Sequence, residues 1–283
     1  KVAEWVARSD TVAHNDTGPG DKAMADDAAL LLIDRPRDGV ARVQLNRPQA
    51  RNALNSALRQ ALARAFDEFD RDEATRCIVI TGGEQFFAAG ADLKEFAPLG
   101  PAAVWRLDAP RWWKAIADCG KPIVAAVAGP ALGGGCELAQ HADVIVAARS
   151  ARFGQPEVAV GIMPGGGATQ RLVKALGKYR AMRLLLTGEP IGADEALAAG
   201  LVSEVVDDAL LMPRVLEIAA LIASRPPVAV RLLKQAALAA DDMPLAAGLM
   251  LERRAFELLF DTADQKEGMQ AFFERRPPQF TGR

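Results

Sequence analysis

The sequence predicts an α/β protein in which sheets pack against helices. Short apolar runs with strand character occupy residues 77–80, 123–128 and 144–147. Between them lie stretches in which apolar residues recur at helical spacing. Alternation of strands and helices along one chain favours a layered α/β core.

Length and composition indicate an ordinary globular protein. The 283 residues can form one large core, or a core with a smaller appendage. Hydrophobic residues make up 50% and charged residues 25% of the chain. The formal net charge of −2 provides no basic surface, which disfavours nucleic acid as a main partner. No apolar run approaches the about 20 residues of a membrane-spanning helix, so no membrane partner is expected.

The cysteines and histidines exclude several kinds of site. Cys77, Cys119 and Cys136 are odd in number and form no C-x-x-C pair. That usage fits a reducing cytoplasm better than a disulfide scaffold, so we expect a cytoplasmic protein. The two histidines, His14 and His141, leave little material for a zinc site or a Ser-His-Asp triad. We interpret His141 as a structural residue of a helix.

The N-terminal residues 1–28 differ from the rest of the chain. They are polar, mixed in charge and broken by Thr17-Gly18-Pro19-Gly20. We expect them to form a mobile extension, with Met24 as a candidate natural start. They contain no positively charged segment followed by an apolar run, which argues against a secretory signal.

A hairpin and a helix are predicted to open the core. Apolar runs at 30–33 and 40–45 flank Pro36-Arg37-Asp38-Gly39, which is a hairpin signal. Asn55 or Ser56 is then a plausible cap for an amphipathic helix. Its apolar residues are Leu54, Leu58, Ala61, Leu62, Ala65 and Phe69.

The most informative stretch is PALGGGCELA at 130–139, between the apolar run 123–128 and a helix expected to open near Gly135. Consecutive glycines let the backbone approach a ligand closely. The free N–H groups of a first helical turn attract negative charge, and Glu137 follows in that turn. Donors for a developing negative charge beside an acid/base group suit acyl-transfer or enolate chemistry. A tight strand-to-helix turn is the alternative interpretation.

Two further stretches carry candidate site residues. Small residues around Gly90 again bring bare backbone N–H groups to a surface. Glu157 follows a proline among apolar residues, where a carboxyl group tends to have a raised pKa and to serve as a proton donor. A surface glutamate in a turn is the alternative for Glu157. Trp105, Trp112 and Trp113 either pack in the core or an interface, or line an acyl pocket.

The C-terminal part of the chain is predicted to be helical. Three helices end at Gly177, Gly188 and Gly200, and a short strand at 201–206 follows. Further helices are broken by prolines at 226–227, 244 and 277–278. We therefore divide the chain into the extension 1–28, a core at 29–206 and a C-terminal helical region at 207–283.

Several motifs in order resemble the enoyl-CoA hydratase/isomerase (crotonase) superfamily, most closely its bacterial enoyl-CoA hydratases. The resemblance runs from about residue 29 to the C-terminus. It is carried by Leu45-Asn46-Arg47-Pro48, Phe87-Ala88-Ala89-Gly90-Ala91-Asp92, Ala131-Leu132-Gly133-Gly134-Gly135-Cys136-Glu137-Leu138, Phe153-Gly154-Gln155-Pro156-Glu157, Gly161-Ile162-Met163-Pro164-Gly165, Thr169-Gln170-Arg171-Leu172 and Ala199-Gly200-Leu201-Val202.

The resemblance implies a spiral of repeated ββα units followed by a helical trimerisation region, in a homotrimer or a homohexamer of two trimers. It implies a coenzyme A thioester substrate, no metal and no redox cofactor. By position, the two oxyanion-hole amides fall on the backbone N–H groups of Ala91 and Gly134. In the family's hydratases the residue matching Glu137 acts as base on water, and the residue matching Glu157 delivers a proton to the α-carbon.

The resemblance also implies contacts with coenzyme A. The segment Ala91-Asp92-Leu93-Lys94 matches the family's substrate-binding loop, next to the amide of Gly134. Phe256 matches an aromatic residue that packs near coenzyme A, often from a neighbouring subunit. Arg275 stands where relatives can place a lysine near the phosphates, and a solvated helix end is its alternative interpretation.

The predicted function is hydration of a 2-enoyl-CoA to a 3-hydroxyacyl-CoA, in β-oxidation of fatty acids or in aromatic-acid degradation. The C-terminal run resembles bacterial hydratases of the phenylacetate type, so a dicarboxylic or branched acyl group is an alternative to a fatty one. Residues 97–118 are expected to shape the acyl pocket. An enoyl-CoA isomerase is the alternative enzyme. A non-catalytic acyl-CoA-binding or RNA-binding relative is the alternative from another class.

Overall fold

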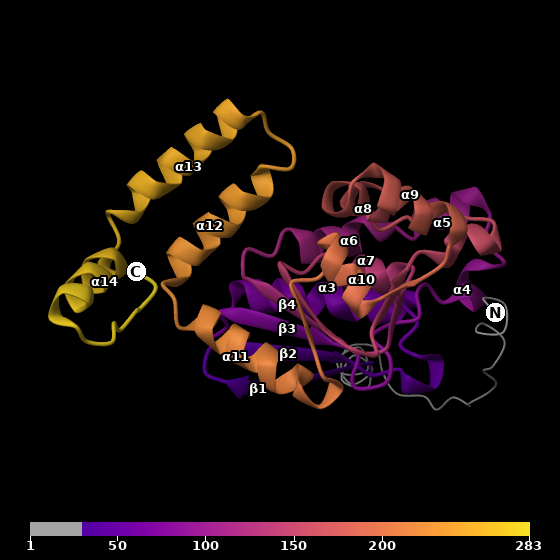
Figure 1. Ribbon diagram of the computed structural model, residues 1–283, viewed down its shortest axis with the longest axis horizontal. Helices are drawn as coiled ribbons and strands as arrows, with labels where there is room; N and C mark the ends of the chain where they lie inside the picture. Colours follow the sequence, from indigo (N-terminus) through magenta and orange to yellow (C-terminus); the bar gives the residue numbers. More distant parts are fainter. Residues whose placement is uncertain (1–29) are drawn as a thin grey trace.

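The computed structural model describes residues 30–283, so the expected extension at 1–28 lies outside the described residues. The chain forms an α/β core, from which an arm of helices extends (Figure 1). The predicted fold class is thereby confirmed.

The main sheet contains six strands in the order β1-β2-β3-β4-β6-β9. β1 runs antiparallel to β2, and the other neighbours are parallel. The predicted hairpin is present, and Gly39 takes a φ of +71° in its turn. The strands are β1 (Leu31–Arg37), β2 (Val40–Leu45), β3 (Cys77–Thr81), β4 (Ile123–Val127), β6 (Val144–Ala148) and β9 (Glu204–Val206).

The strand expected at 201–206 is shorter than the sequence predicted, because β9 begins only at Glu204. The N–H group of Leu201 donates to the carbonyl of Ala196 at 2.9 Å, so Leu201 still belongs to the end of the preceding helix. Leu201 and Val202 are apolar because they are buried in the core, and not because they pair in the sheet.

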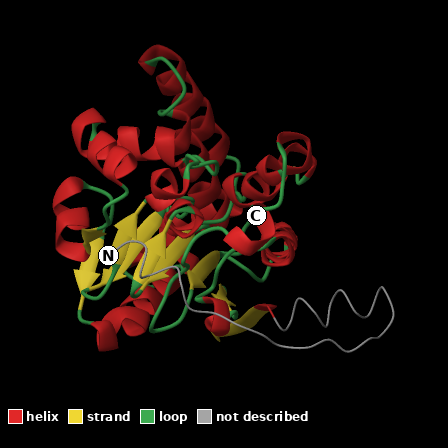
Figure 2. Cartoon of the chain, turned by 90° about the vertical axis from the view of Figure 1, so that its right-hand side faces the viewer, coloured by secondary structure: helices red, strands yellow, loops and turns green. Residues whose placement is uncertain are grey.

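Both faces of the main sheet are buried. Ile78 and Ile80 face the cluster that contains α3 (Ser56–Arg71) and α6 (Ala109–Ala117). Cys77 and Val79 point to the opposite side and pack against α11 (Leu211–Ala223). Figure 2 shows helices on both sides of the strands. This two-sided burial explains why β3 is apolar at every position except its last.

A second, smaller sheet has the order β5-β7-β8. β5 (Pro130–Leu132) pairs with β7 (Arg152–Gly154) in parallel, and β7 pairs with β8 (Ile191–Gly192) in antiparallel orientation. Sequence periodicity did not separate these strands, because two or three residues are too few to show an alternation.

The remaining helices follow the predicted order. Three of these helices end at the predicted glycines, and each glycine has a positive φ: 74° at Gly177, 69° at Gly188 and 85° at Gly200. The core helices are α4 (Leu93–Phe96), α5 (Pro101–Arg106), α7 (Gly134–Ala139), α8 (Ala168–Leu176), α9 (Lys178–Thr187) and α10 (Ala193–Ala199).

The arm consists of α12 (Pro227–Ala239), α13 (Leu245–Leu259) and α14 (Ala263–Glu274). It extends from the core on the side away from α4 and α5 (Figure 1). Of the predicted proline breaks, Pro226 and Pro244 directly precede α12 and α13, and Pro227 is the first residue of α12. The start of α14 was missed, since the side chain of Thr262 caps it by accepting from the N–H group of Gln265 at 3.1 Å.

Asn52 ties the ends of two strands to the loop that follows β3. Its side chain is 2% exposed, and its φ is +55°. The amide oxygen accepts from the N–H group of Arg47 at 2.9 Å, just after β2. The amide nitrogen donates to the carbonyls of Gly82 at 2.8 Å and of Phe86 and Phe87 at 3.2 Å. Asn52 therefore fixes the path of the chain toward Ala91.

We expect Asn52→Ala to lower the free energy of unfolding by about 2–4 kcal/mol, because it leaves buried backbone groups unpaired and places alanine at positive φ. Urea denaturation followed by circular dichroism measures the change. Asp67→Ala, on the exposed face of α3, is the control and should change stability by no more than about 0.5 kcal/mol. Equal effects of the two substitutions would contradict the role given to Asn52.

Candidate active site

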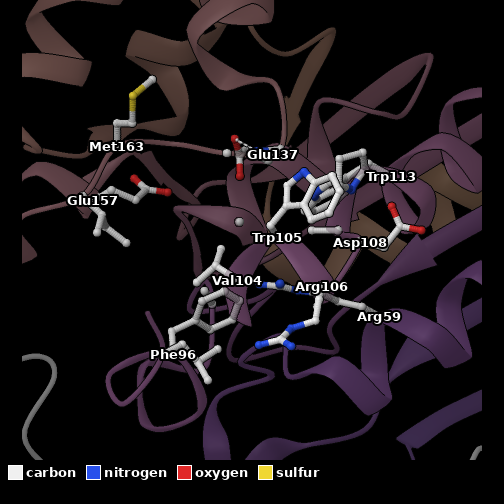
Figure 3. A pocket seen from close by; sticks show the side chains of 18 residues that line it. Arg59, Phe96, Val104, Trp105, Arg106, Asp108, Trp113, Glu137, Glu157 and Met163 are labelled. Atoms are coloured by element: carbon white, nitrogen blue, oxygen red, sulfur yellow. Dashed lines mark hydrogen bonds between the residues drawn. The ribbon is translucent and has the colours of Figure 1, made fainter. Parts of the chain in front are cut away.

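A cavity of about 930 Å³ lies where α7, the loop before α4 and helices α4–α6 meet. Four predicted site residues line it together, namely Ala91, Gly134, Glu137 and Glu157. Figure 3 shows the side chains of Glu137 and Glu157 on the same part of its wall. The fold thus brings together residues that are up to 66 positions apart in sequence (157 − 91).

Backbone pairing positions the loop that carries Ala91. Two isolated parallel bridges join Ala88 to Ala131 and Leu54 to Ala91. The N–H group of Leu132 donates to the carbonyl of Ala88 at 3.0 Å. The loop therefore runs beside β5, directly before the glycine turn.

The glycine triplet allows this close approach. Gly133 takes a φ of +50°, and a Cβ atom on it would lie 2.8 Å from Oε1 of Glu157. A Cβ atom on Gly135 would lie 2.2 Å from the carbonyl oxygen of Ala88. A Cβ atom on Gly134 would lie 3.6 Å from the nitrogen of Ala91, which makes these two predicted amides close neighbours. Among the hydrogen bonds of the described loops and caps, neither amide donates to a backbone carbonyl.

Glu137 is a buried carboxylate with a fixed orientation. Its Oε1 atom accepts from the N–H groups of Gly166 at 2.6 Å and Ala168 at 3.1 Å. Burial raises its pKa above the ordinary value, and the two backbone donors and the charges of Arg59 and Arg171 oppose that rise. Because both bonds use Oε1, Oε2 is left to contact a ligand.

Glu157 lies in the 3-10 turn Pro156–Val160, after β7. Burial raises its pKa to about 7, and the nearby charge of Glu137 adds to the rise. The sequence-based expectation of a raised pKa is therefore confirmed. Gln155 is fully buried, and with its NH₂ group facing the carboxylate it donates to both oxygens at 3.1 Å. Near neutral pH the pocket therefore holds two carboxyl groups in different surroundings.

Helices α4–α6 form a largely apolar wall of the cavity. Phe96, Trp105 and Trp113 line it, while Trp112 is buried beside it in the core. Both interpretations of the tryptophans thus hold, for different residues. The expectation that 97–118 shapes the pocket is confirmed by its further lining residues Leu99, Val104, Arg106, Asp108, Ala109 and Pro110.

His141 supports this wall. Its ring stacks on that of Trp113, with 5.0 Å between ring centroids and an interplanar angle of 14°. Its Nδ1 atom lies 2.8 Å from the carbonyl oxygen of Glu137. Burial lowers the pKa of His141 to about 4, so the ring is neutral at pH 7 and Nδ1–H donates. The structural interpretation holds, although α7 already ends at Ala139.

Other predicted contacts lie outside the cavity. Asp92 forms an ion pair with Arg47 at 3.1 Å, and Leu93 and Lys94 begin α4, next to Ala91. Phe256 on α13 and Arg275 at the end of α14 are not among the lining residues. Within one chain, both belong to the arm and not to the pocket wall.

Sequence reasoning missed Arg59 and Gln155. Arg59 lines the cavity from α3 and is 7% exposed. Its signal was a charged residue next to Leu58 on the apolar side of an amphipathic helix. The signal for Gln155 was an amide in the otherwise small and apolar run before Glu157.

The described residues offer neither a cluster of metal ligands nor a membrane-spanning helix. Within 30–283, no three or more His, Cys, Asp or Glu side chains gather as they would to hold a metal ion. In that same part of the chain, no helix is long and apolar enough to cross a membrane.

The fold and the pocket define an α/β protein with paired carboxyl groups beside two closely spaced backbone amides. The model of one family, enoyl-CoA hydratase/isomerase, matches residues 35–283. The chain belongs to this family, as its motifs predicted.

Individual relatives match over nearly their whole length. The 2,3-dehydroadipyl-CoA hydratase of Escherichia coli is 45% identical over 253 residues, which cover 89% of this chain and 99% of the relative. The crystal structure of enoyl-CoA hydratase from Bacillus anthracis superposes with a TM-score of 0.87 at 38% identity, covering 90% of this chain and 100% of that one. The enoyl-CoA hydratase subunit I of Geobacillus kaustophilus has a TM-score of 0.86 at 44% identity, covering 90% and 98%.

We expect Gly166→Ala to disturb the carboxylate of Glu137. The added Cβ would lie 2.7 Å from both Oε2 of Glu137 and Cε2 of Trp113, so the free energy of unfolding should fall by about 1–3 kcal/mol. Gly165→Ala is the matched control, because its Cβ meets nothing within 4 Å. Chemical denaturation followed by tryptophan fluorescence compares the two. A Gly166→Ala variant as stable as Gly165→Ala would refute the packing described.

Proposed function

We propose that the protein is an enoyl-CoA hydratase, which adds water across the 2,3 double bond of a 2-enoyl-CoA to give a 3-hydroxyacyl-CoA. The observation that carries this proposal is that Glu137 and Glu157 line one cavity with the backbone of Ala91 and Gly134. The names of the Escherichia coli and Bacillus anthracis relatives support it.

The two amides would stabilise the charge that forms during addition. Attack of water at C3 moves electrons onto the thioester oxygen and gives an enolate. The N–H groups of Ala91 and Gly134 would donate to that oxygen, and such bonds strengthen as the charge develops. Removing one donor of an oxyanion hole typically costs about 3–4 kcal/mol of transition-state stabilisation. Because the donors belong to the backbone, their position depends on the fold and not on a rotamer.

The two glutamates would divide the proton transfers. Glu137 would accept a proton from water while the water oxygen bonds to C3. Its Oε1 is held by Gly166 and Ala168, so Oε2 is available for the water. Glu157 would give its proton to C2 as the enolate collapses. A pKa of about 7 lets Glu157 carry that proton near neutral pH.

We propose that the reaction needs no metal and no redox cofactor. Hydration adds a proton to C2 and hydroxide to C3, and this requires no external oxidant or reductant. Coenzyme A is part of the substrate, and the charge on the thioester oxygen would be met by the two amides.

Contacts with coenzyme A and the assembly belong to the same proposal. Asp92, Leu93 and Lys94 adjoin Ala91 and would border the thioester. Phe256 and Arg275 lie on the arm, so they would reach coenzyme A through a neighbouring copy in a homotrimer or a dimer of trimers. The arm exposes large apolar side chains that such contacts would cover, namely Leu233, Leu245, Met250, Phe256, Phe272 and Phe273.

We expect the protein to hydrate crotonyl-CoA, and Glu137→Gln and Glu157→Gln each to lower kcat/KM by about 10²- to 10⁴-fold, because each removes a positioned proton transfer. Loss of the enoyl absorbance measures the rate. Glu189→Gln, an exposed substitution, is the control and should retain wild-type activity.

A folded protein that binds coenzyme A but hydrates no short, long or dicarboxylic 2-enoyl-CoA would overturn the proposal. Conversion of a 3-enoyl-CoA to a 2-enoyl-CoA by that protein would identify an isomerase. Binding without either reaction would leave an acyl-CoA-binding function.

The pH dependence of hydration follows from Glu157. A carboxyl group with a pKa of about 7 is protonated below that pH and loses its proton above it, so kcat/KM should fall as the pH rises through about 7. Initial rates between pH 5.5 and 9 measure this fall in kcat/KM. It should persist in Glu189→Gln and disappear from the residual activity of Glu157→Gln. A rate that keeps rising above pH 7 would contradict the role of Glu157 as proton donor.

A further inference from the structure

Arg59 is a buried cation in the wall of the active-site cavity. It belongs to α3, is 7% exposed and lines the same space as Glu137 and Glu157 (Figure 3). The chemistry proposed above assigns it no step, although a buried guanidinium without a partner is costly.

Within the described chain, one donor of the Arg59 side chain has no acceptor. Its Nε atom is enclosed and has no hydrogen-bond partner. The guanidinium carbon lies 5.0 Å from the ring centroid of Phe96 and 5.7 Å from that of Trp112. These rings attract the positive charge, but they supply no oxygen to the five N–H donors.

Each acidic residue whose charge acts on Arg59 has another hydrogen-bond or ion-pair partner. Burial lowers the pKa of Arg59, and the charges of Glu95, Glu137 and Asp92 oppose that shift, yet none of these three forms an ion pair with it within the described chain. Oε2 of Glu95 accepts from the N–H group of Ser56 at 2.8 Å. Asp92 pairs with Arg47, and Glu137 accepts from the backbone N–H groups of Gly166 and Ala168. The guanidinium is thus kept charged but free to bind an anion from the cavity.

We propose that Arg59 forms a subsite for a carboxylate at the far end of the acyl chain, so that the preferred substrate is a 2-enoyl-CoA with a carboxylate-terminated chain. This inference rests on the proposed function. The reacting end is fixed by Ala91 and Gly134, and the wall from Phe96 to Trp113 would contact the methylene groups between. A carboxylate can accept two parallel hydrogen bonds from one guanidinium.

Charge in the cavity explains why one residue would decide this preference. A second carboxylate entering a pocket that already holds Glu137 and Glu157 is repelled, unless a cation meets it. Arg106 and Asp108 also line the cavity, but both are exposed, opposite in charge and screened by water. Arg59 is buried, so its attraction for an anion is screened far less.

The test compares two substrates with six-carbon acyl chains, 2,3-dehydroadipyl-CoA and trans-2-hexenoyl-CoA. Wild-type kcat/KM should favour the carboxylate substrate by about 10-fold or more, since charge-assisted hydrogen bonds give that discrimination. Arg59→Met should lower kcat/KM for the carboxylate substrate by about 10- to 100-fold more than for hexenoyl-CoA, whose kcat/KM should change only through the effect of Arg59 on the pKa of Glu137. Arg59→Lys should retain part of the preference. Arg71→Met, at the exposed end of the same helix, is the matched control and should change neither value.

A binding measurement separates this inference from the proposed function. Calorimetry with the unreactive adipyl-CoA and hexanoyl-CoA should give tighter binding of adipyl-CoA to the wild type and not to Arg59→Met. That result without hydration would refute the enzyme activity and uphold the subsite. Thermal unfolding of each variant verifies that it is folded.

Equal wild-type affinities for the two ligands would overturn the subsite. So would an Arg59→Met variant whose kcat/KM falls by the same factor for both substrates, because Arg59 would then act through Glu137 alone and not on the acyl chain.

Discussion

The site depends on the contact between the loop around Ala88 and the glycine turn before α7. There the backbone passes so close that a Cβ atom on Gly135 would lie 2.2 Å from the carbonyl oxygen of Ala88. One hydrogen bond across the contact joins Leu132 to Ala88 at 3.0 Å. The amides of Ala91 and Gly134 are neighbours only because these segments touch, so the small side chains of both segments are a steric requirement of the site. Asn52 holds the same loop from its other side.

The two carboxyl groups of the cavity differ in the hydrogen-bond donors and the charges that surround them. Glu137 receives two N–H groups from the segment before and at the start of α8, which favour its ionised form. Glu157 accepts from the side chain of Gln155, and burial together with the charge of Glu137 raises its pKa to about 7. Burial raises the pKa of both groups, but the charges of Arg59 and Arg171 oppose the rise at Glu137, whereas the charge of Glu137 adds to the rise at Glu157.

The sequence predicted features that depend on neighbouring residues, and it missed contacts between segments that lie far apart in the chain. β3 and α3 were predictable, because their apolar patterns are local and long enough to be periodic. β5, β7 and β8 have two or three residues each, and their pairing is set by segments far away. The raised pKa of Glu157 followed from its neighbours in sequence. Arg59 was missed because the rings beside it, Phe96 and Trp112, come from positions 37 (96 − 59) and 53 (112 − 59) residues later. Phe256 and Arg275 lie on the arm and do not line the pocket of their own described chain, so this chain alone does not test the contacts predicted for them.

One part of the cavity wall depends on the backbone, and another part depends on side chains. The part with Ala91, Gly134 and Glu137 consists of backbone amides and of a carboxylate held by backbone donors, so it can change little without changing the fold. The wall formed by α3 and α4–α6 consists of side chains, which can be exchanged while the sheet and the glycine turn stay in place. Relatives with one fold can accordingly keep one chemistry and differ in the acyl groups they accept. On our proposal, the buried charge of Arg59 meets a group that the acyl chain itself brings, because an apolar residue in its place would serve stability at least as well.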